Sequence, residues 1–97
     1  MLRPALLALA VSLLAMPALA AGNFEAQPLS RPSRERFVAG DNAWRCGDGG
    51  CRSARTSTRP ALVCSTLVRE VGPLASFSVD GRAFDAPALE ACNRRAH

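Results

Sequence analysis

Three glycines and an aspartate separate two cysteines in the segment Cys46-Gly47-Asp48-Gly49-Gly50-Cys51. Glycine and aspartate tolerate the positive φ angles that a tight chain reversal needs, so this segment predicts a hairpin turn. Residues opposite each other on a hairpin lie within range of a disulfide. The sequence therefore predicts a hairpin closed by a bond between Cys46 and Cys51.

The residues before this turn predict a strand, and those before the strand predict an extended arm. The strand begins at Phe37 and continues through residues 42–46 around Trp44, whose ring we expect in the core beside the disulfide. Residues 21–36 contain few large apolar side chains, two prolines and a polar run with three arginines, a composition typical of disorder. We therefore expect a disordered arm over 21–36 and a folded domain over 37–97.

After the hairpin, the sequence predicts a helix, a second hairpin and a last helix. Pro60 suits a first helical turn, and apolar residues then recur at three- and four-residue steps until Gly72-Pro73 ends the helix. Alternating side chains over residues 74–79 predict a strand, and Asp80-Gly81 is typical of a two-residue turn that leads to a return strand. Asp85 is positioned to cap the final helix.

These elements predict the fold class, a small disulfide-stapled α+β domain in which antiparallel β-hairpins pack with two short helices. Cys64 and Cys92 lie on the inward stripes of the two helices, so packing the helices together would also bring these thiols together. Four cysteines permit three pairings, of which we favour Cys46–Cys51 and Cys64–Cys92. Such bonds are needed because the chain has few large apolar residues and its core is small.

The first twenty residues predict a secretory signal peptide, residues 1–20. Arg3 supplies a positive start, residues 5–16 are apolar apart from one serine, and Ala18-Leu19-Ala20 has the pattern of a cleavage site. We place the cut between Ala20 and Ala21. The apolar run is too short for a spanning helix, so we expect no membrane span in the mature chain. The residue directly after the cut is not a cysteine that could carry a lipid, since the first cysteine is Cys46. The expected location is periplasmic or secreted, where disulfides persist.

Basic charge gathers in one part of the chain. Residues 31–59 hold seven arginines and three acidic residues, whereas four of each cancel over residues 60–97. A basic patch concentrates anions, so we expect an anionic envelope component or an acidic protein to bind Arg45, Arg52 and Arg55 around the first hairpin. The alternative is a solvated surface that serves solubility alone. Nucleic acid is not an expected partner, because the chain is exported and a single tryptophan is a poor stacking platform.

Residues that build enzyme active sites are scarce. Histidine occurs only as the terminal His97, lysine does not occur, and three of the aspartates are expected in turns or at a cap. The sequence therefore predicts a non-enzymatic binding or structural protein with no cofactor and no metal. One alternative is a thiol–disulfide redox protein that uses Cys46 and Cys51, and another is a zinc-binding module. Spacing disfavours both, since working dithiols are Cys-x-x-Cys at a helix N-terminus and structural zinc sites use two closely spaced pairs.

Four segments resemble a family of small exported, cysteine-containing proteins of unknown function from alphaproteobacteria. The segments are WRCGDGGC at 44–51, RPALVC at 59–64, GPLASFSV at 72–79 and ACN at 91–93. The likeness extends over residues 36–96. It implies a Gram-negative envelope setting, and it implies no activity, cofactor or site residue.

Overall fold

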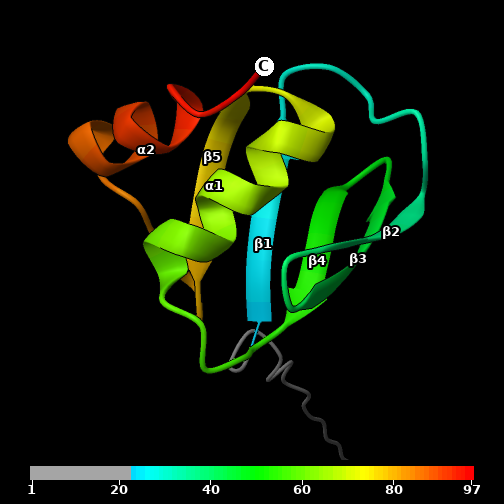
Figure 1. Cartoon of the computed structure of the whole chain (residues 1–97), viewed down its shortest axis with the longest axis horizontal. Coiled ribbons are helices and arrows are strands. Elements are labelled where there is room, and N and C mark those ends of the chain that lie inside the picture. The colour runs from blue at the N-terminus through cyan, green and yellow to red at the C-terminus, as the bar shows by residue number, and fades with distance from the viewer. Residues whose placement is uncertain (1–22) are drawn as a thin grey trace, which may run out of the picture.

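Six antiparallel strands form one sheet with two helices against it in the computed structural model, which describes residues 23–97 (Figure 1). The predicted signal peptide and its cleavage site lie outside the described residues. The elements are β1 (Asn23–Pro28), β2 (Arg36–Ala39), β3 (Asn42–Gly47), β4 (Gly50–Ala54), α1 (Pro60–Val71), β5 (Leu74–Val79), β6 (Arg82–Ala83) and α2 (Ala86–Asn93).

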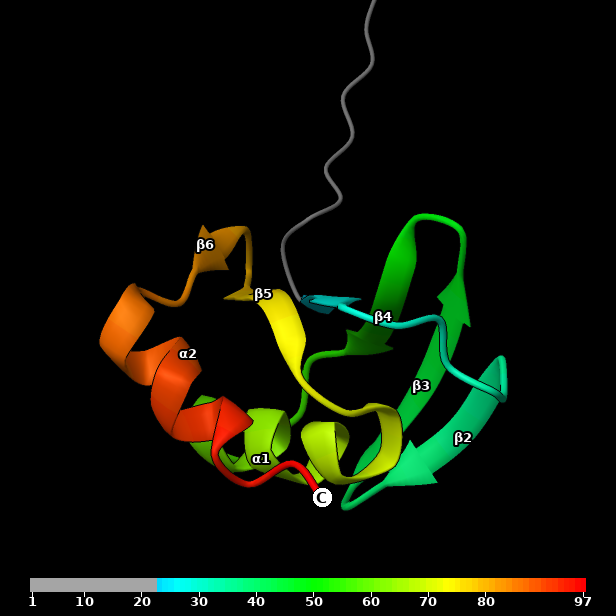
Figure 2. The same ribbon diagram turned by 90° about the horizontal axis from the view of Figure 1, so that it is seen from above.

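The sheet has the strand order β2-β3-β4-β1-β5-β6, and every neighbouring pair is antiparallel. Although β1 is the first strand in the chain, it lies inside the sheet between β4 and β5. Figure 2 shows the sheet curving around α1, with α2 on the same side. Within residues 23–97, the opposite face of the sheet is therefore not covered by a helix.

The position of β1 corrects the prediction of a disordered arm over residues 21–36. Phe24 and Ala26 are buried, and Phe24 lies opposite Ser53 of β4 and Val79 of β5. A strand between two neighbours has its backbone hydrogen-bonded on both sides and needs apolar side chains on one face only. The two buried side chains meet that need, but an average composition over the whole segment hides such a short alternation. Only the remainder that links β1 to β2 is irregular.

A second correction concerns residues 37–46, predicted as one strand but folded as the β2–β3 hairpin. Gly40 has a φ of 62° and Asp41 completes a two-residue turn, with Ala39 opposite Asn42. Glycine is the residue that adopts a positive φ at the first turn position without steric strain. The Gly-Asp dipeptide is thus a turn signal that the single-strand interpretation missed.

The other elements confirm the predictions and, with them, the α+β fold class. Helix α1 begins at the predicted proline and ends where Gly72 has a φ of 84°. Asp80 and Gly81 both have positive φ in the turn between β5 and β6. Asp85 caps α2, its side chain accepting a 3.0 Å hydrogen bond from the backbone N–H of Ala88.

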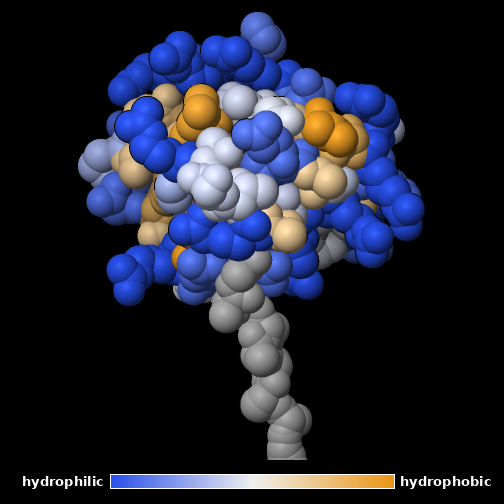
Figure 3. All heavy atoms as spheres, turned by 60° about the horizontal axis from the view of Figure 1, so that its bottom comes forward, coloured by the Kyte–Doolittle hydropathy of each residue, from blue (hydrophilic) through white to orange (hydrophobic). Residues whose placement is uncertain are grey.

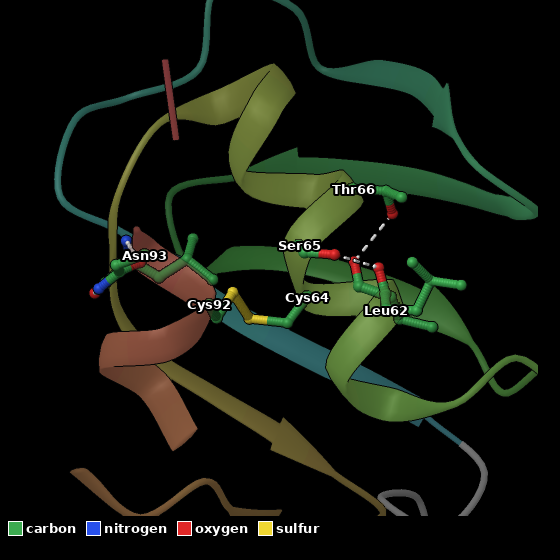
Figure 4. Close-up of a disulfide and its surroundings, with 8 residues drawn as sticks. Leu62, Cys64, Ser65, Thr66, Cys92 and Asn93 are labelled. Carbon is green, nitrogen blue, oxygen red and sulfur yellow. Dashed lines mark hydrogen bonds between the residues drawn. A yellow bond between two sulfur atoms is a disulfide. The ribbon is translucent and has the colours of Figure 1, made fainter. Parts of the chain in front are cut away.

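The core fills the space between the sheet and the helices and contains both predicted disulfides. Cys46–Cys51 joins β3 to β4, with Cα atoms 4.0 Å apart, and Cys64–Cys92 joins α1 to α2, with Cα atoms 5.9 Å apart. Figure 4 shows the second bond bridging the facing sides of the two helices. The largest buried side chains around these bonds are Trp44, Phe24, Phe77, Leu67 and Leu74.

Gly50 allows the β3–β4 hairpin to lie close against β1. A Cβ atom at Gly50 would lie 2.6 Å from the carbonyl oxygen of Ala26 and 2.6 Å from Nε2 of Gln27, at a φ of +107°. The same Gln27 amide donates a 2.8 Å hydrogen bond to the carbonyl of Gly49, so β1 also supports the turn.

We expect Gly50→Ala to lower the free energy of unfolding by about 1–3 kcal/mol, because both the close contact and the positive φ oppose a side chain. Denaturant unfolding followed by circular dichroism measures the loss. Gly47→Ala is the control, since no atom lies within 4 Å of a Cβ built there. Equal stability of the two variants would contradict the close approach of the hairpin to β1.

Candidate functional site

The uncovered face of the sheet carries a row of three arginines. Arg36 of β2 lies opposite Arg45 of β3, which lies opposite Arg52 of β4. Residues opposite each other in adjacent strands point to the same face, and all three residues are exposed. Neighbouring strands are about 4.8 Å apart, so the three side chains leave the sheet within about 10 Å of one another. We call Arg36, Arg45 and Arg52 the arginine row.

The positive charge of the row is balanced at one end only. Glu25 of β1 lies opposite Arg52, and its Oε2 atom is 3.2 Å from Nη2 of Arg52. The four ion pairs among residues 23–97 include neither Arg36 nor Arg45. Like charges on directly opposed residues repel each other. The row therefore holds unbalanced positive charge at its β2–β3 end.

Two open hollows border the row. One, of about 330 Å³, is lined by Glu25 and Arg45 together with the glycines of the β3–β4 turn. The other, of about 380 Å³, lies across β2 and β3, with Arg36 and Arg45 beside Val38 and Ala43. The second hollow thus combines two guanidinium groups with small and apolar side chains, which suits a ligand that carries a negative charge on an uncharged body, whereas the first also contains the Glu25 carboxylate.

Large apolar side chains on the described surface are few and scattered, and one of them, Val38, lies beside the arginine row. The exposed ones are Leu29, Val38 and Leu62. On the face that Figure 3 presents, apolar residues form small patches surrounded by polar and charged residues. Charge, and not a broad apolar patch, is therefore the feature that distinguishes the candidate site.

Arg55, the third predicted anion-binding residue, lies apart from the row. Its Nε atom is 3.2 Å from Oδ2 of Asp80, and Nη1 donates a 2.8 Å hydrogen bond to the carbonyl of Thr56. The guanidinium group also lies 5.1 Å from the centre of the Phe24 ring, which belongs to the core. The structure thus brings Arg45 and Arg52 together and places Arg55 over the end of the core.

Arg36 is the member of the row that sequence reasoning missed. The available signal was the turn at Gly40 and Asp41. Counting outward from that turn pairs Arg36 with Arg45, as observed in the β2–β3 register. A single strand over residues 37–46 would put Arg36 and Arg45 far apart along one strand, whereas the hairpin sets them side by side.

Two other arginines of the basic region are occupied in holding the segment before β2 onto the domain. Arg31 donates a 2.7 Å hydrogen bond to Asp48, and this bond and the attraction of the carboxylate raise the pKa of Arg31 above its usual value. Arg34 lies 3.0 Å from the carboxylate of Glu70, and its guanidinium group is 5.6 Å from the centre of the Phe37 ring. Among the arginines of the basic region, the described ion pairs therefore leave Arg36 and Arg45 of the row, and Arg59 before α1, without an acidic partner.

The environment of Cys46 and Cys51 favours a structural role for their bond. The two residues are 6% and 2% exposed and lie on strands, whereas reactive thiols are accessible and are commonly activated at a helix N-terminus. Within residues 23–97 no cysteine is free, and no three His, Cys, Asp or Glu residues are grouped so that they could hold a metal ion.

Comparison with known families places the chain among uncharacterised proteins. A family of unknown function, DUF8200, matches residues 8–94. The chain belongs to this family. Membership in DUF8200 agrees with the resemblance to an uncharacterised family noted from the sequence, and it assigns no activity to any residue. No curated protein and no solved structure matches the chain.

Neither helix in the described part of this DUF8200 chain is long and apolar enough to cross a membrane. With no activity attached to the family, the arrangement of charges on the sheet is the basis for any functional argument.

Proposed function

We propose that the protein is a non-enzymatic binding protein of the periplasm or the secreted fraction that uses the arginine row to bind an anionic partner. The observation that carries this proposal is the unbalanced charge of Arg36 and Arg45 on an uncovered sheet face. Guanidinium groups bind carboxylates and phosphates through paired, charge-assisted hydrogen bonds. An anion shared between these two side chains would also relieve their mutual repulsion.

Two disulfides support an oxidising compartment as the setting, because thiols stay reduced in the cytosol. The predicted signal peptide would supply the route of export. We infer a Gram-negative envelope, in line with the alphaproteobacterial family that the sequence resembles. The anionic partner is then an envelope component or an acidic protein of that compartment.

Replacing the arginine row tests the proposal. We expect the triple variant Arg36→Gln, Arg45→Gln and Arg52→Gln to bind anionic probes about tenfold more weakly, since each exposed ionic contact contributes about 0.5 kcal/mol. The probes are vesicles containing phosphatidylglycerol and beads carrying polyglutamate, and co-sedimentation of the mature protein measures binding. Binding should also weaken as salt screens the charges.

The matched control removes the same three charges elsewhere, at Arg82, Arg94 and Arg95, none of which takes part in the ion pairs of the described residues. Retained binding in this variant would assign the effect to the row. Equal losses in both triple variants would show that net charge alone acts, and failure of the unaltered protein to bind either probe would refute the proposal.

The redox and zinc alternatives have less support, since all four cysteines are paired and the bonds lie in the core. The reduction potential of Cys46–Cys51 separates catalysis from structure. A value below about −300 mV marks a structural bond, whereas one near −200 mV lies in the range of thiol–disulfide catalysts.

A further inference from the structure

The free edge of the sheet lies beside the arginine row. Strand β2 is at the end of the strand order, so one side of its backbone has no neighbouring strand among residues 23–97. The amide of Cys46 donates a 2.7 Å hydrogen bond to the carbonyl of Glu35. Because hydrogen-bonded and non-bonded pairs alternate in an antiparallel ladder, Arg36 and Val38 direct their N–H and C=O groups away from β3. The edge thus offers two backbone donors and two acceptors to an incoming strand.

The side chains at this edge are an arginine and an exposed valine on the same face. Val38 is 68% exposed and lies opposite Ala43. The hollow of about 380 Å³ across β2 and β3 connects this apolar pair with Arg36 and Arg45. A strand added at β2 would lie about 4.8 Å away. It would place one side chain against Val38 and another, two residues along, against Arg36.

We propose that β2 receives an extended acidic segment of a partner protein as a seventh strand, with a carboxylate against Arg36 and an apolar side chain against Val38. In this mode of recognition, main-chain hydrogen bonds supply affinity and alternate side chains supply specificity. The inference rests on the proposed function and deepens it, because it names the anionic partner as an acidic polypeptide.

A second copy of the chain is a poorer occupant of the same edge. Pairing β2 with another β2 would join two arginine rows into one face, and like charges on neighbouring strands repel. Charged residues on edge strands commonly prevent such self-pairing. The positive charge of Arg36 would repel a second copy of the chain and attract an acidic segment, so this one residue would favour the acidic partner over self-pairing.

The test uses a short capped peptide in which valine and glutamate, two residues apart, alternate with threonine. The mature protein is titrated with this peptide by NMR. We expect binding that slows hydrogen exchange at the Arg36 and Val38 amides, because these N–H groups become bonded. This measurement needs no variant, so it holds even where a substitution disturbs folding.

Val38→Pro and Val38→Thr form a matched pair of variants. Proline removes an outward N–H that the β2–β3 ladder does not use and is tolerated on edge strands, whereas threonine keeps the N–H and the β-branched shape. We expect Val38→Pro and Arg36→Gln each to weaken peptide binding about tenfold, the effect of losing one charge-assisted or backbone hydrogen bond of about 1.4 kcal/mol. Arg94→Gln should stay within about twofold of the unaltered protein. Val38→Thr keeps the N–H but makes the contact surface more polar, so we expect it to lose less binding than Val38→Pro.

Protected Arg36 and Val38 amides, with a larger loss of binding in Val38→Pro than in Val38→Thr and a loss in Arg36→Gln but not in Arg94→Gln, would support strand addition. Equal peptide binding by Val38→Pro and Val38→Thr would overturn it, as would equal binding of a peptide with glutamine in place of glutamate. Binding to phosphatidylglycerol vesicles without binding to the peptide would also overturn strand addition but leave the arginine row as an anion site. Absence of binding to every anionic probe would overturn the proposed function itself.

Discussion

Replacing Cys64 and Cys92 together by alanine is expected to lower the free energy of unfolding by about 3.5 kcal/mol, according to the loop-entropy model. The bond spans a sequence separation of 28 residues, so breaking it releases a long loop in the unfolded chain. A domain of this size has a total stability of roughly 5 kcal/mol. Loss of this one bond would therefore leave the protein close to the limit of folding.

The attachment of α2 explains why this bond has a large effect. Cys92 is the only buried residue of α2, while Phe84 and Leu89 are partly buried against the core. The side chain of Asn93 accepts a 2.9 Å hydrogen bond from the backbone N–H of Leu74 and donates a 3.0 Å bond to its carbonyl. Without the disulfide, these few contacts would have to hold α2 against the domain.

Thermal and denaturant unfolding followed by circular dichroism measure the loss. The control is the double variant Cys46→Ala and Cys51→Ala. It breaks a bond with a sequence separation of only 5 residues, so the expected loss is about 2 kcal/mol. A larger loss from the hairpin bond than from the helix bond would contradict the account.

Phe24→Ala is expected to lower the free energy of unfolding by about 3–5 kcal/mol, as for other buried phenylalanines. The Phe24 side chain is fully buried in an interior strand, and its ring stacks on that of Phe77 with centroids 6.0 Å apart. Truncation would leave a cavity between the sheet and the helices and would remove the ring beneath Arg55.

Leu29→Ala is the control for Phe24→Ala, since Leu29 follows β1 directly and is 66% exposed. Denaturant unfolding should change by less than about 0.5 kcal/mol in this variant. If Phe24→Ala had an equally small effect, residues 23–28 would not be part of the sheet, and the original expectation of a disordered arm would return.

The elements that sequence reasoning placed correctly are those with strong local signals. The Asp80-Gly81 turn adopts the positive φ angles that its dipeptide favours, and Asp85 caps α2 as its position predicted. Helix α1 ends at Gly72, where the chain needs a positive φ. Each of these outcomes depends on a few consecutive residues, so no knowledge of the tertiary structure was required.

The error over β1 has its physical cause in contacts between distant residues. Strand β1 has two buried side chains and gains its stability from β4 and β5, whose partners Ser53 and Val79 lie far along the chain. No property of residues 21–36 alone shows that two strands flank them. The missed β2–β3 turn is different, because Gly40 and Asp41 did carry a local signal that was not used.

In the candidate site, too, some features follow from the local sequence and others depend on tertiary contacts. Arg45 and Arg52 face each other because both flank one short turn, so their proximity follows from the hairpin alone. The position of the Arg55 guanidinium group depends on its contacts with Asp80 and Phe24. These two residues are 25 and 31 positions away in the sequence, and only the folded sheet brings them close to Arg55. Ion pairing with such partners decides which arginines remain available for a ligand.

Local chemistry in the chain thus determined the turns, the helices, the caps and the two disulfide pairs, because each depends on neighbouring residues or on a helix stripe. Tertiary structure alone decided that an apparently polar N-terminal segment is an interior strand, that Arg55 is drawn away to Asp80, and that the strand carrying Arg36 lies at a free edge of the sheet. The reason is that hydrogen bonding between strands joins residues with no sequence relation, and such pairing leaves no trace in composition.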